Sequence, residues 1–455
     1  MLERKFTSFI ERFLQEEPNK ILLVNGARQI GKSYLIRYVG QKLFPHFVEI
    51  NLKEDIEGDK VFADVHTTND LYMRLSNYYS TPLGDKTDTL VFLDEIQSYP
   101  HLMTILKFLN QESRYRFIAS GFQLGVALSE TPSVPLGSVA IEQMYPLDFE
   151  EFLWATGIGK EWIENIREHF IQGRPLDEST HNILLKRFQY YLLVGGLPEA
   201  INNYLADRNM VRVRQTHRDI HNLYRIDASQ YDEEHKLKIR KIYDLIPSNL
   251  ENKKKRVVYK NIENKKGKTF SDYADEFEYL TNSGVALEVS AISNPRFPLA
   301  ESEQKRLVKL YLNDVGLLTS LLYGVNVNAV LQDIKSINLG TVYESVVAQE
   351  LAAHGFKLHY YDNKKKGEVD FLIDEFDQLT VLPLEIKSGK DYTEHSALSK
   401  FLESQDYGIN RAFVFSNERK IFKKNGATYL PIYYCMFLSD EHRKGPVILP
   451  ELEII

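Results

Sequence analysis

The segment NGARQIGKSYLIR, residues 25–37, holds two glycines five positions apart and then a lysine and a hydroxyl residue. Gly26, Gly31, Lys32 and Ser33 fit the pattern G-x-x-x-x-G-K-[ST]. In such a loop, backbone N–H groups wrap a phosphate, the lysine reaches the β- and γ-phosphates, and the hydroxyl holds magnesium. The residues expected to line the nucleotide site are Gly26, Ala27, Arg28, Gln29, Ile30, Gly31, Lys32, Ser33 and Tyr34.

A phosphate loop of this kind needs acidic partners, and the segment TLVFLDEIQSYP, residues 89–100, offers them. Its apolar run predicts a buried strand that ends at Asp94 and Glu95. We expect Asp94 in the magnesium shell and Glu95 as the group that polarises the attacking water. A later run, YRFIASG, predicts another strand with Ser120 at its tip. Ser120 is either a sensor of the γ-phosphate or an ordinary turn serine.

The elements around these residues predict an α/β fold with a parallel sheet. KILLV is a short apolar strand before the loop, and the leucines and isoleucines of SYLIRYVGQKLF recur at helical spacing after it. HFVEINLKED predicts a further strand. Ligands of parallel α/β sheets bind at the carboxyl ends of the strands, so the loop, Asp94 and Glu95 should meet at one edge.

Bulk composition limits the other possibilities. A chain of 455 residues is too long for one ordinary domain, and its net charge of -7 excludes a global basic field for nucleic acid. Its one cysteine, Cys435, excludes an intrachain disulfide and a cysteine zinc cluster. The N-terminal residues predict an amphipathic helix rather than a signal peptide, and the longest apolar runs are too short to span a membrane. We expect a cytoplasmic protein.

Seven segments together resemble a large prokaryotic family of AAA-type ATPases that carry a C-terminal domain of unknown function with a restriction-endonuclease-like core. These segments are GARQIGKS, LVFLDEIQ, IASGFQLGVAL, YPLDFEEF, VGGLPEA, LYLNDVGLL and GEVDFLI…LEIKSG. The resemblance covers nearly the whole chain and favours ATP over GTP, with Mg²⁺.

The resemblance implies four regions. They are an AAA-type ATP-binding core at 1–150, a helical lid at 151–244, a winged-helix-like segment at 245–324 and a PD-(D/E)xK nuclease-like α/β domain at 325–455. Helical periodicity in residues 151–194 agrees with the lid. Gly195 and Gly196 then break it, either as a structural turn or as a turn that reaches the nucleotide.

The sequence departs from the family in the loop before YPLDFEEF. Many relatives carry a basic residue after a glycine there, whereas this chain has Ser138 after Gly137. If that residue is the arginine finger, hydrolysis should be slow or should depend on a partner. Arg225, Arg114 and Arg116 are the candidates to replace it, as is an arginine supplied by a protein partner or a second copy in a homo-oligomer.

A local basic stretch interrupts the acidic chain. It contains Lys253, Lys254, Lys255, Arg256, Lys260, Lys265, Lys266 and Lys268. A predicted helix and two strands follow it, which is typical of a winged helix. The stretch is either a solvated lysine loop or a surface that binds DNA through backbone phosphates without reading its sequence.

The segment GEVDFLIDEFDQLTVLPLEIKSGK predicts a hairpin that could carry a second chemistry. Glu385 and Lys387 are two apart on one strand and so share a face, and Asp370 can lie beside them. An upstream helix offers Glu344 and Glu350. The resemblance implies Mg²⁺ held by Glu344, Asp370 and Glu385, with Lys387 activating water; the alternative is a surface ion-pair cluster.

Three functions are therefore open from the sequence. The first is a Mg-dependent ATPase that acts as a molecular switch and engages DNA or a protein partner. The second is an ATP-gated, metal-dependent DNA nuclease. The third is a non-hydrolysing switch that binds DNA or protein.

Overall fold

The computed structural model describes residues 2–17, 19–78, 83–124, 137–227, 235–332, 337, 339–363, 365–389, 392–393 and 396–439. Most of the loop before Gly137 lies outside these ranges, as does the C-terminal segment 440–455. Within the described ranges, none of the helices combines the length and the apolar character needed to cross a bilayer.

The N-terminal sheet has five parallel strands in the order β2-β3-β4-β1-β5. Its strands are β1 (Ile21–Asn25), β2 (His46–Asn51), β3 (Thr89–Asp94), β4 (Arg116–Gly121) and β5 (Val139–Gln143). The parallel α/β sheet is as predicted, and β1, β3 and β4 end at the same edge. The sequence had placed β5 in a loop. This edge strand is only partly buried, so the apolar run that marks its neighbours is missing.

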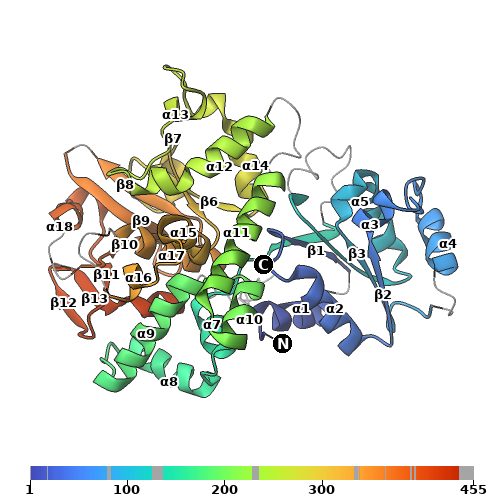
Figure 1. The fold of residues 1–455 in the computed structure, drawn as a ribbon, viewed down its shortest axis with the longest axis horizontal. Helices are drawn as coiled ribbons and strands as arrows, with labels where there is room; N and C mark the ends of the chain where they lie inside the picture. The colour runs from blue at the N-terminus through green and yellow to red at the C-terminus, as the bar shows by residue number, and fades with distance from the viewer. Residues whose placement is uncertain are drawn as a thin grey trace, which may run out of the picture.

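Helices cover both faces of this sheet (Figure 1). They are α1 (Lys5–Glu16), α2 (Lys32–Leu43), α3 (Leu52–Glu57), α4 (Thr68–Tyr78) and α5 (Pro100–Glu112). Alternate residues of β1 enter different cores, as strand geometry requires. Ile21 and Leu23 pack with α4 and α5, whereas Leu22 and Val24 join a larger core shared with the rest of the molecule. The amphipathic N-terminal helix is confirmed, with its apolar face in that shared core.

Five helices follow the sheet; in Figure 1, α7, α10 and α11 lie between the sheet and the C-terminal half, and α8 and α9 lie below that half. They are α7 (Phe149–Ala155), α8 (Lys160–Ile171), α9 (Glu178–Val194), α10 (Pro198–Asp207) and α11 (Met210–Asp227). The glycine pair separates α9 from α10. A Cβ on Gly196 would lie 2.0 Å from the Leu147 carbonyl oxygen, and one on Gly195 would lie 2.2 Å from the Asp314 carboxylate. Both positions therefore require glycine for close packing.

The region from 235 to 331 contains helices and the first two strands of a second sheet. Its elements are α12 (Lys236–Glu251), α13 (Lys260–Glu263), α14 (Ala274–Asn282), β6 (Ala286–Ile292), β7 (Glu303–Leu312), α15 (Val315–Tyr323) and α16 (Asn328–Leu331). The expected boundary at residue 245 falls inside α12. The expected two-stranded wing is also not separate, because β6 pairs in parallel with β8 of the next region.

The second sheet has eight strands in the order β12-β13-β11-β10-β9-β8-β6-β7. The elements after residue 339 are α17 (Gly340–Ala353), β8 (His359–Asn363), β9 (Gly367–Glu375), β10 (Thr380–Ile386), α18 (Ser396–Leu402), β11 (Ala412–Ser416), β12 (Phe422–Lys424) and β13 (Ala427–Pro431). The predicted hairpin is confirmed as the antiparallel pair β9–β10. Cys435 is fully buried and acts as a small core residue.

Candidate nucleotide site and a second acidic site

The loop between β1 and α2 adopts a conformation that depends on its two glycines. Gly26 has φ 152°, and a Cβ there would lie 2.5 Å from the Met144 carbonyl oxygen. Gly31 is left-handed at φ 95° and is the N-cap of α2, where no side chain caps the helix. The first N–H groups of α2 therefore face the loop as donors, and they coincide with the positive end of the helix dipole.

Lys32, at the start of α2, folds back over its own loop. Its Nζ donates to the carbonyl oxygens of Gly26 and Ala27, each at 2.9 Å, and the side chain is almost fully buried. Burial lowers the pKa of Lys32 to about 8, although Glu95 and Asp94 act to raise it. An ammonium held only by backbone carbonyls can exchange those acceptors for phosphate oxygens at little cost.

The acidic pair lies where the sequence predicted, at the end of β3 beside the loop. Asp94 is buried, and its Oδ1 accepts hydrogen bonds from the Ser120 hydroxyl and, at 3.1 Å, from the Glu95 N–H. Glu95 is left-handed at φ 54°, a conformation that costs free energy for a non-glycine residue and is concentrated at functional sites. Its Oε2 accepts from Gln97 Nε2 at 2.5 Å.

Ser120, the predicted sensor of the γ-phosphate, contacts Asp94 in this structure. It is fully buried on β4 and donates to Asp94, so in this structure it orients the candidate magnesium carboxylate. The register explains the contact: β4 lies between β1 and β3, which brings Ser120 between the phosphate loop and Asp94. A direct contact between Ser120 and phosphate stays a prediction.

The loop side chain Arg28 lies between two acids. Its Nη1 donates to Asp227 Oδ1 at 2.6 Å, and its Nη2 is 3.8 Å from Glu95 Oε2. Its guanidinium also lies over the Phe122 ring, with 5.5 Å between Cζ and the ring centroid. Asp227, the last residue of α11, is buried, and burial raises its pKa to about 6 even though Arg28 acts to lower it.

Segments far along the chain also contact the loop. Tyr224 on α11 donates its hydroxyl to the Arg28 carbonyl oxygen at 2.9 Å. Gly284, in the turn between α14 and β6, lies so close that a Cβ there would be 3.1 Å from the Ala27 nitrogen. Asn25 Nδ2 donates to the Asn282 carbonyl oxygen at 3.0 Å. No local sequence pattern marks these contacts, because they join residues 196 to 257 positions apart in the chain.

The donors and acceptors of this site fit a nucleotide phosphate with magnesium. The glycine cradle, the open α2 N-terminus and the buried Lys32 supply hydrogen-bond donors and positive charge for an anion. Ser33 follows Lys32 on α2, and its hydroxyl with the Asp94 carboxylate supplies the oxygen ligands that magnesium prefers. Tyr34 is exposed, as is Gln29, so these two residues lie at the outer rim of the predicted contacts.

The structure also distinguishes the three arginines proposed for the missing finger. Arg116 is buried, and it donates to the carbonyl oxygens of Glu17 and Leu14, so it is committed to packing. Arg114 lies before β4, at the end of the strand opposite Ser120, and stacks on two tyrosine rings. Arg225 pairs with Asp244 on α12, with its Nε at 2.7 Å from Oδ1.

The second acidic site lies on the eight-stranded sheet, and the four predicted side chains converge there. Asp370 on β9 accepts from the Ile386 N–H at 2.8 Å, and Lys387 Nζ is 2.8 Å from Glu385 Oε1. Burial, together with the neighbouring Glu344 and Glu385, raises the pKa of Asp370 well above its ordinary value. The predicted pairing of Glu385 with Lys387 on one face is confirmed.

The expected magnesium at this second site does not fit the arrangement. Lys255, from the basic stretch, pairs directly with Glu344, and Tyr311 donates to the other Glu344 oxygen at 3.3 Å. Lys387 is already paired with Glu385. Among the residues that the structure describes, no group of three His, Cys, Asp or Glu side chains is placed to hold a metal ion. In this structure the carboxylates pair with lysine ammonium groups, where the sequence predicted a magnesium ion.

The basic stretch is divided between two roles. Lys255 and Arg256 turn inward and pair with Glu344 and Asp362. The exposed members of the stretch are Lys253, Lys254, Lys260, Lys265 and Lys266. Only this exposed group remains available to phosphates of a nucleic acid.

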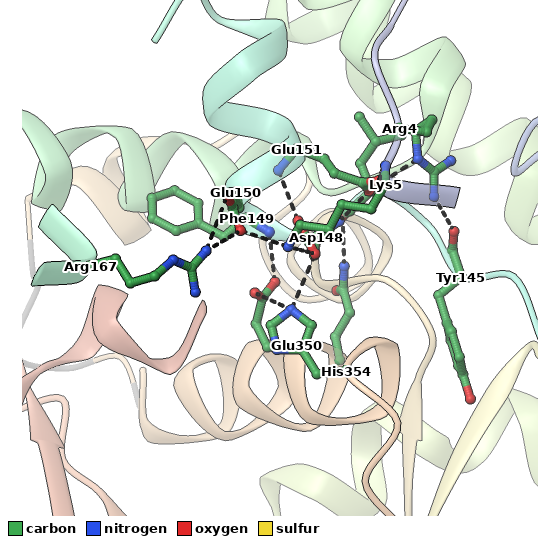
Figure 2. A network of polar contacts seen from close by, with 12 residues as sticks. Arg4, Lys5, Tyr145, Asp148, Phe149, Glu150, Glu151, Arg167, Glu350 and His354 are labelled. Carbon is green, nitrogen blue, oxygen red and sulfur yellow. Dashed lines mark hydrogen bonds and ion pairs between the residues drawn. The ribbon is translucent and has the colours of Figure 1, made fainter. Parts of the chain in front are cut away.

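A buried polar network joins the N-terminal helix, the YPLDFEEF segment and α17 (Figure 2). Lys5 Nζ lies 2.7 Å from Asp148 Oδ2, and His354 Nε2 lies 3.2 Å from the same oxygen. Glu350 Oε1 accepts from the Phe149 N–H at 2.8 Å. Burial and the nearby Asp148 raise the pKa of Glu350 well above its ordinary value. Glu350, which the sequence offered beside Glu344 for the second site, therefore belongs to this network.

Arg4 connects the same network to the phosphate loop. Its Nε lies 3.0 Å from Glu151 Oε2, and its Nη1 donates to the Ile30 carbonyl oxygen at 3.2 Å. Asp148 caps α7 in a capping box with Glu151, which fixes both carboxylates. The network thus links the nucleotide loop to helix α17 of the C-terminal half.

Comparisons with known proteins divide the chain into three parts. Residues 18–153 match a family described as AAA domain. Residues 185–328 and 339–435 match two different families, each described as a domain of unknown function (DUF8612 and DUF4143). No curated protein matches the chain. The first match supports an AAA-type P-loop ATPase domain, in agreement with the loop geometry.

Two solved structures illustrate the structural comparison. The Walker-type ATPase PABY2304 of Pyrococcus abyssi is 14% identical with a TM-score of 0.44, over 71% of this chain and 96% of that one. The Thermotoga maritima RuvB Holliday junction branch migration motor is 14% identical with a TM-score of 0.30, over 66% and 91%. At these TM-scores neither likeness bears on the fold or function of this chain.

Proposed function

We propose that this protein binds ATP with Mg²⁺ and hydrolyses it, and that the bound nucleotide sets the position of its helical and C-terminal regions. The observation that carries the proposal is the convergence of Lys32, Asp94 and Glu95 at the carboxyl edge of a parallel sheet, beside a glycine loop and an open helix N-terminus. The match of residues 18–153 to AAA domains supports it.

The residues take complementary roles in hydrolysis. Lys32 and the N–H groups of the loop bind the phosphates, while Ser33 and Asp94 are the oxygen ligands for Mg²⁺, which neutralises phosphate charge. Glu95 accepts a proton from a water molecule as the water oxygen attacks the γ-phosphorus. The bond from that phosphorus to the bridging oxygen breaks, so ADP and inorganic phosphate leave.

The contacts around the loop support a switch as well as an enzyme. Tyr224 and Gly284 touch the loop backbone from other regions of the molecule, and Arg4 joins the loop to the polar network that reaches α17. A phosphate that displaces Lys32 from its carbonyl acceptors changes the loop directly beside these contacts, so nucleotide binding can shift the regions that make them. The exposed lysines of the basic stretch are the surface we propose for a DNA partner, through backbone phosphates.

Nucleotide binding is the direct test. Isothermal titration with Mg-ATP should give saturable binding to the wild type and none to Lys32→Ala. Tyr38→Phe, an exposed position on α2 outside the loop, is the matched control and should bind like the wild type. Equal affinity of wild type and Lys32→Ala would refute the proposed site.

A further inference from the structure

The loop contains a second cation besides Lys32, and no part of the P-loop pattern requires it. Arg28 occupies one of the four variable positions between Gly26 and Gly31. Its side chain is three-quarters buried and lies between the Glu95 and Asp227 carboxylates. Phosphoryl transfer needs positive charge beside the γ-phosphate, which many P-loop enzymes obtain from an arginine.

We infer that Arg28 is the catalytic arginine of this ATPase, supplied by the phosphate loop itself, and that Asp227 holds it ready on the lid side. The inference rests on the proposed hydrolysis of ATP. It accounts for Ser138 at the position where a basic residue was expected.

Proximity to the water-polarising group is the first argument. The Arg28 Nη2 atom lies 3.8 Å from Glu95 Oε2, so the guanidinium and the candidate base face the same space. A γ-phosphate that is held by Lys32 and attacked by a water molecule at Glu95 therefore lies close to the Arg28 guanidinium.

The state of Asp227 is the second argument. This carboxylate is 1% exposed, its Oδ1 accepts from Arg28 at 2.6 Å, and its Oδ2 is buried with no hydrogen-bond partner in the described structure. Asp227 therefore holds the guanidinium through a single hydrogen bond and not through the stronger bidentate pair. A phosphate with more oxygen acceptors can outcompete this contact, and Asp227 is the last residue of α11, one of the helices of the proposed lid.

The other arginines lack these features. On α11, Tyr224 and Asp227 are three residues apart and both touch Arg28, so they share a helix face. Arg225 points away from that face and pairs with Asp244. It is therefore the matched control for removing an arginine from the same neighbourhood.

The test compares Arg28→Ala, Arg28→Lys and Arg225→Ala in the full chain, with thermal unfolding to confirm folding. Phosphate release should fall by about 10³-fold in Arg28→Ala and change less than about twofold in Arg225→Ala. Titration with ADP should give the same affinity in all variants. ATPγS affinity should fall about tenfold in Arg28→Ala, and added guanidinium should restore part of its turnover.

Binding and turnover separate the possible failures. If the wild type binds ATPγS more tightly than ADP but does not release phosphate, the proposed hydrolysis is wrong. The contact between Arg28 and the γ-phosphate is then still tested, because Arg28→Ala should lose the preference for ATPγS. Turnover of Arg28→Ala within threefold of wild type would overturn the inference, as would equal losses of ADP and ATPγS affinity. Asp227→Asn alone should strengthen the preference for ATPγS over ADP. The same substitution added to Arg28→Ala should leave that preference unchanged.

Discussion

The phosphate loop and the acidic site on the second sheet both bring lysines and carboxylates together, but their charges are arranged differently. In the loop, Lys32 is held by neutral backbone carbonyls and Asp94 accepts from neutral donors, while Glu95 accepts from Gln97 and lies 3.8 Å from Arg28. On the second sheet, Lys255 and Lys387 are paired directly with Glu344 and Glu385. The first arrangement leaves Lys32 available for a ligand, whereas the second pairs both lysines with carboxylates of the protein.

The difference shows that residue types alone do not define a site. A D…E-x-K pattern and a G-x-x-x-x-G-K-S pattern both contain the groups that bind magnesium or phosphate. What separates them is which partner each charged group already has, and for Glu344 that partner is Lys255, which lies 89 residues away in the chain.

The largest effect expected on the second site comes from removing its ammonium. Lys255→Met should lower the free energy of unfolding by about 3 kcal/mol, because Glu344 would stay buried without its cation. Lys255→Met combined with Glu344→Gln should recover much of that loss. Urea unfolding of both variants measures the effect. If Mg²⁺ stabilises Lys255→Met beyond its effect on the wild type, the site takes a metal and the contrast with the loop is wrong.

A smaller effect is expected in the network that connects the two regions. Glu350→Ala should cost about 2 kcal/mol, since it leaves the buried Phe149 N–H without an acceptor. Glu350→Gln keeps an oxygen acceptor without a charge. Because burial already favours the protonated form of Glu350, this variant should stay within about 0.5 kcal/mol of the wild type at neutral pH. Equal losses in the two variants would show that the carboxylate charge is needed.

The pH dependence of the free loop should be of about the same size, and it reports Lys32 alone. Its pKa is about 8 when folded against an ordinary 10.5, so burying its charge destabilises the fold at neutral pH. That penalty disappears as pH rises above 8, since the folded protein loses the proton first. The wild type should gain about 2 kcal/mol relative to Lys32→Met between pH 7.5 and 10. A constant difference between the two proteins across this range would mean that Lys32 is not desolvated.

Local sequence patterns predicted much of this molecule. The strand, loop and helix around Lys32 were readable because a contiguous motif specifies them, and the β9–β10 hairpin followed from alternation and turn residues. Strand β5 was missed because its residues are only partly buried and it lies at the sheet edge. The sequence predicted a separate two-stranded wing, whereas β6 also pairs with β8. That pairing joins segments far apart in the chain, so no local pattern encodes it.

Helix periodicity explains why only one of the two glutamates offered by α17 lies at the second site. Glu344 and Glu350 are six residues apart on α17, which turns their side chains roughly 240° from one another. They cannot serve the same site, and the structure places Glu344 at the second sheet and Glu350 in the network with Asp148. Asp227 and Tyr224 could not be anticipated, since only the docking of α11 against the loop brings them to Arg28.

Phosphate release by the wild type and Glu95→Gln, with Mg-ATP and with and without duplex DNA, tests the central claim most directly. The account predicts turnover in the wild type, a loss of at least about 10²-fold in Glu95→Gln, and ATP still bound by that variant. Turnover that survives Glu95→Gln unchanged, or a wild type that binds no ATP, would contradict it.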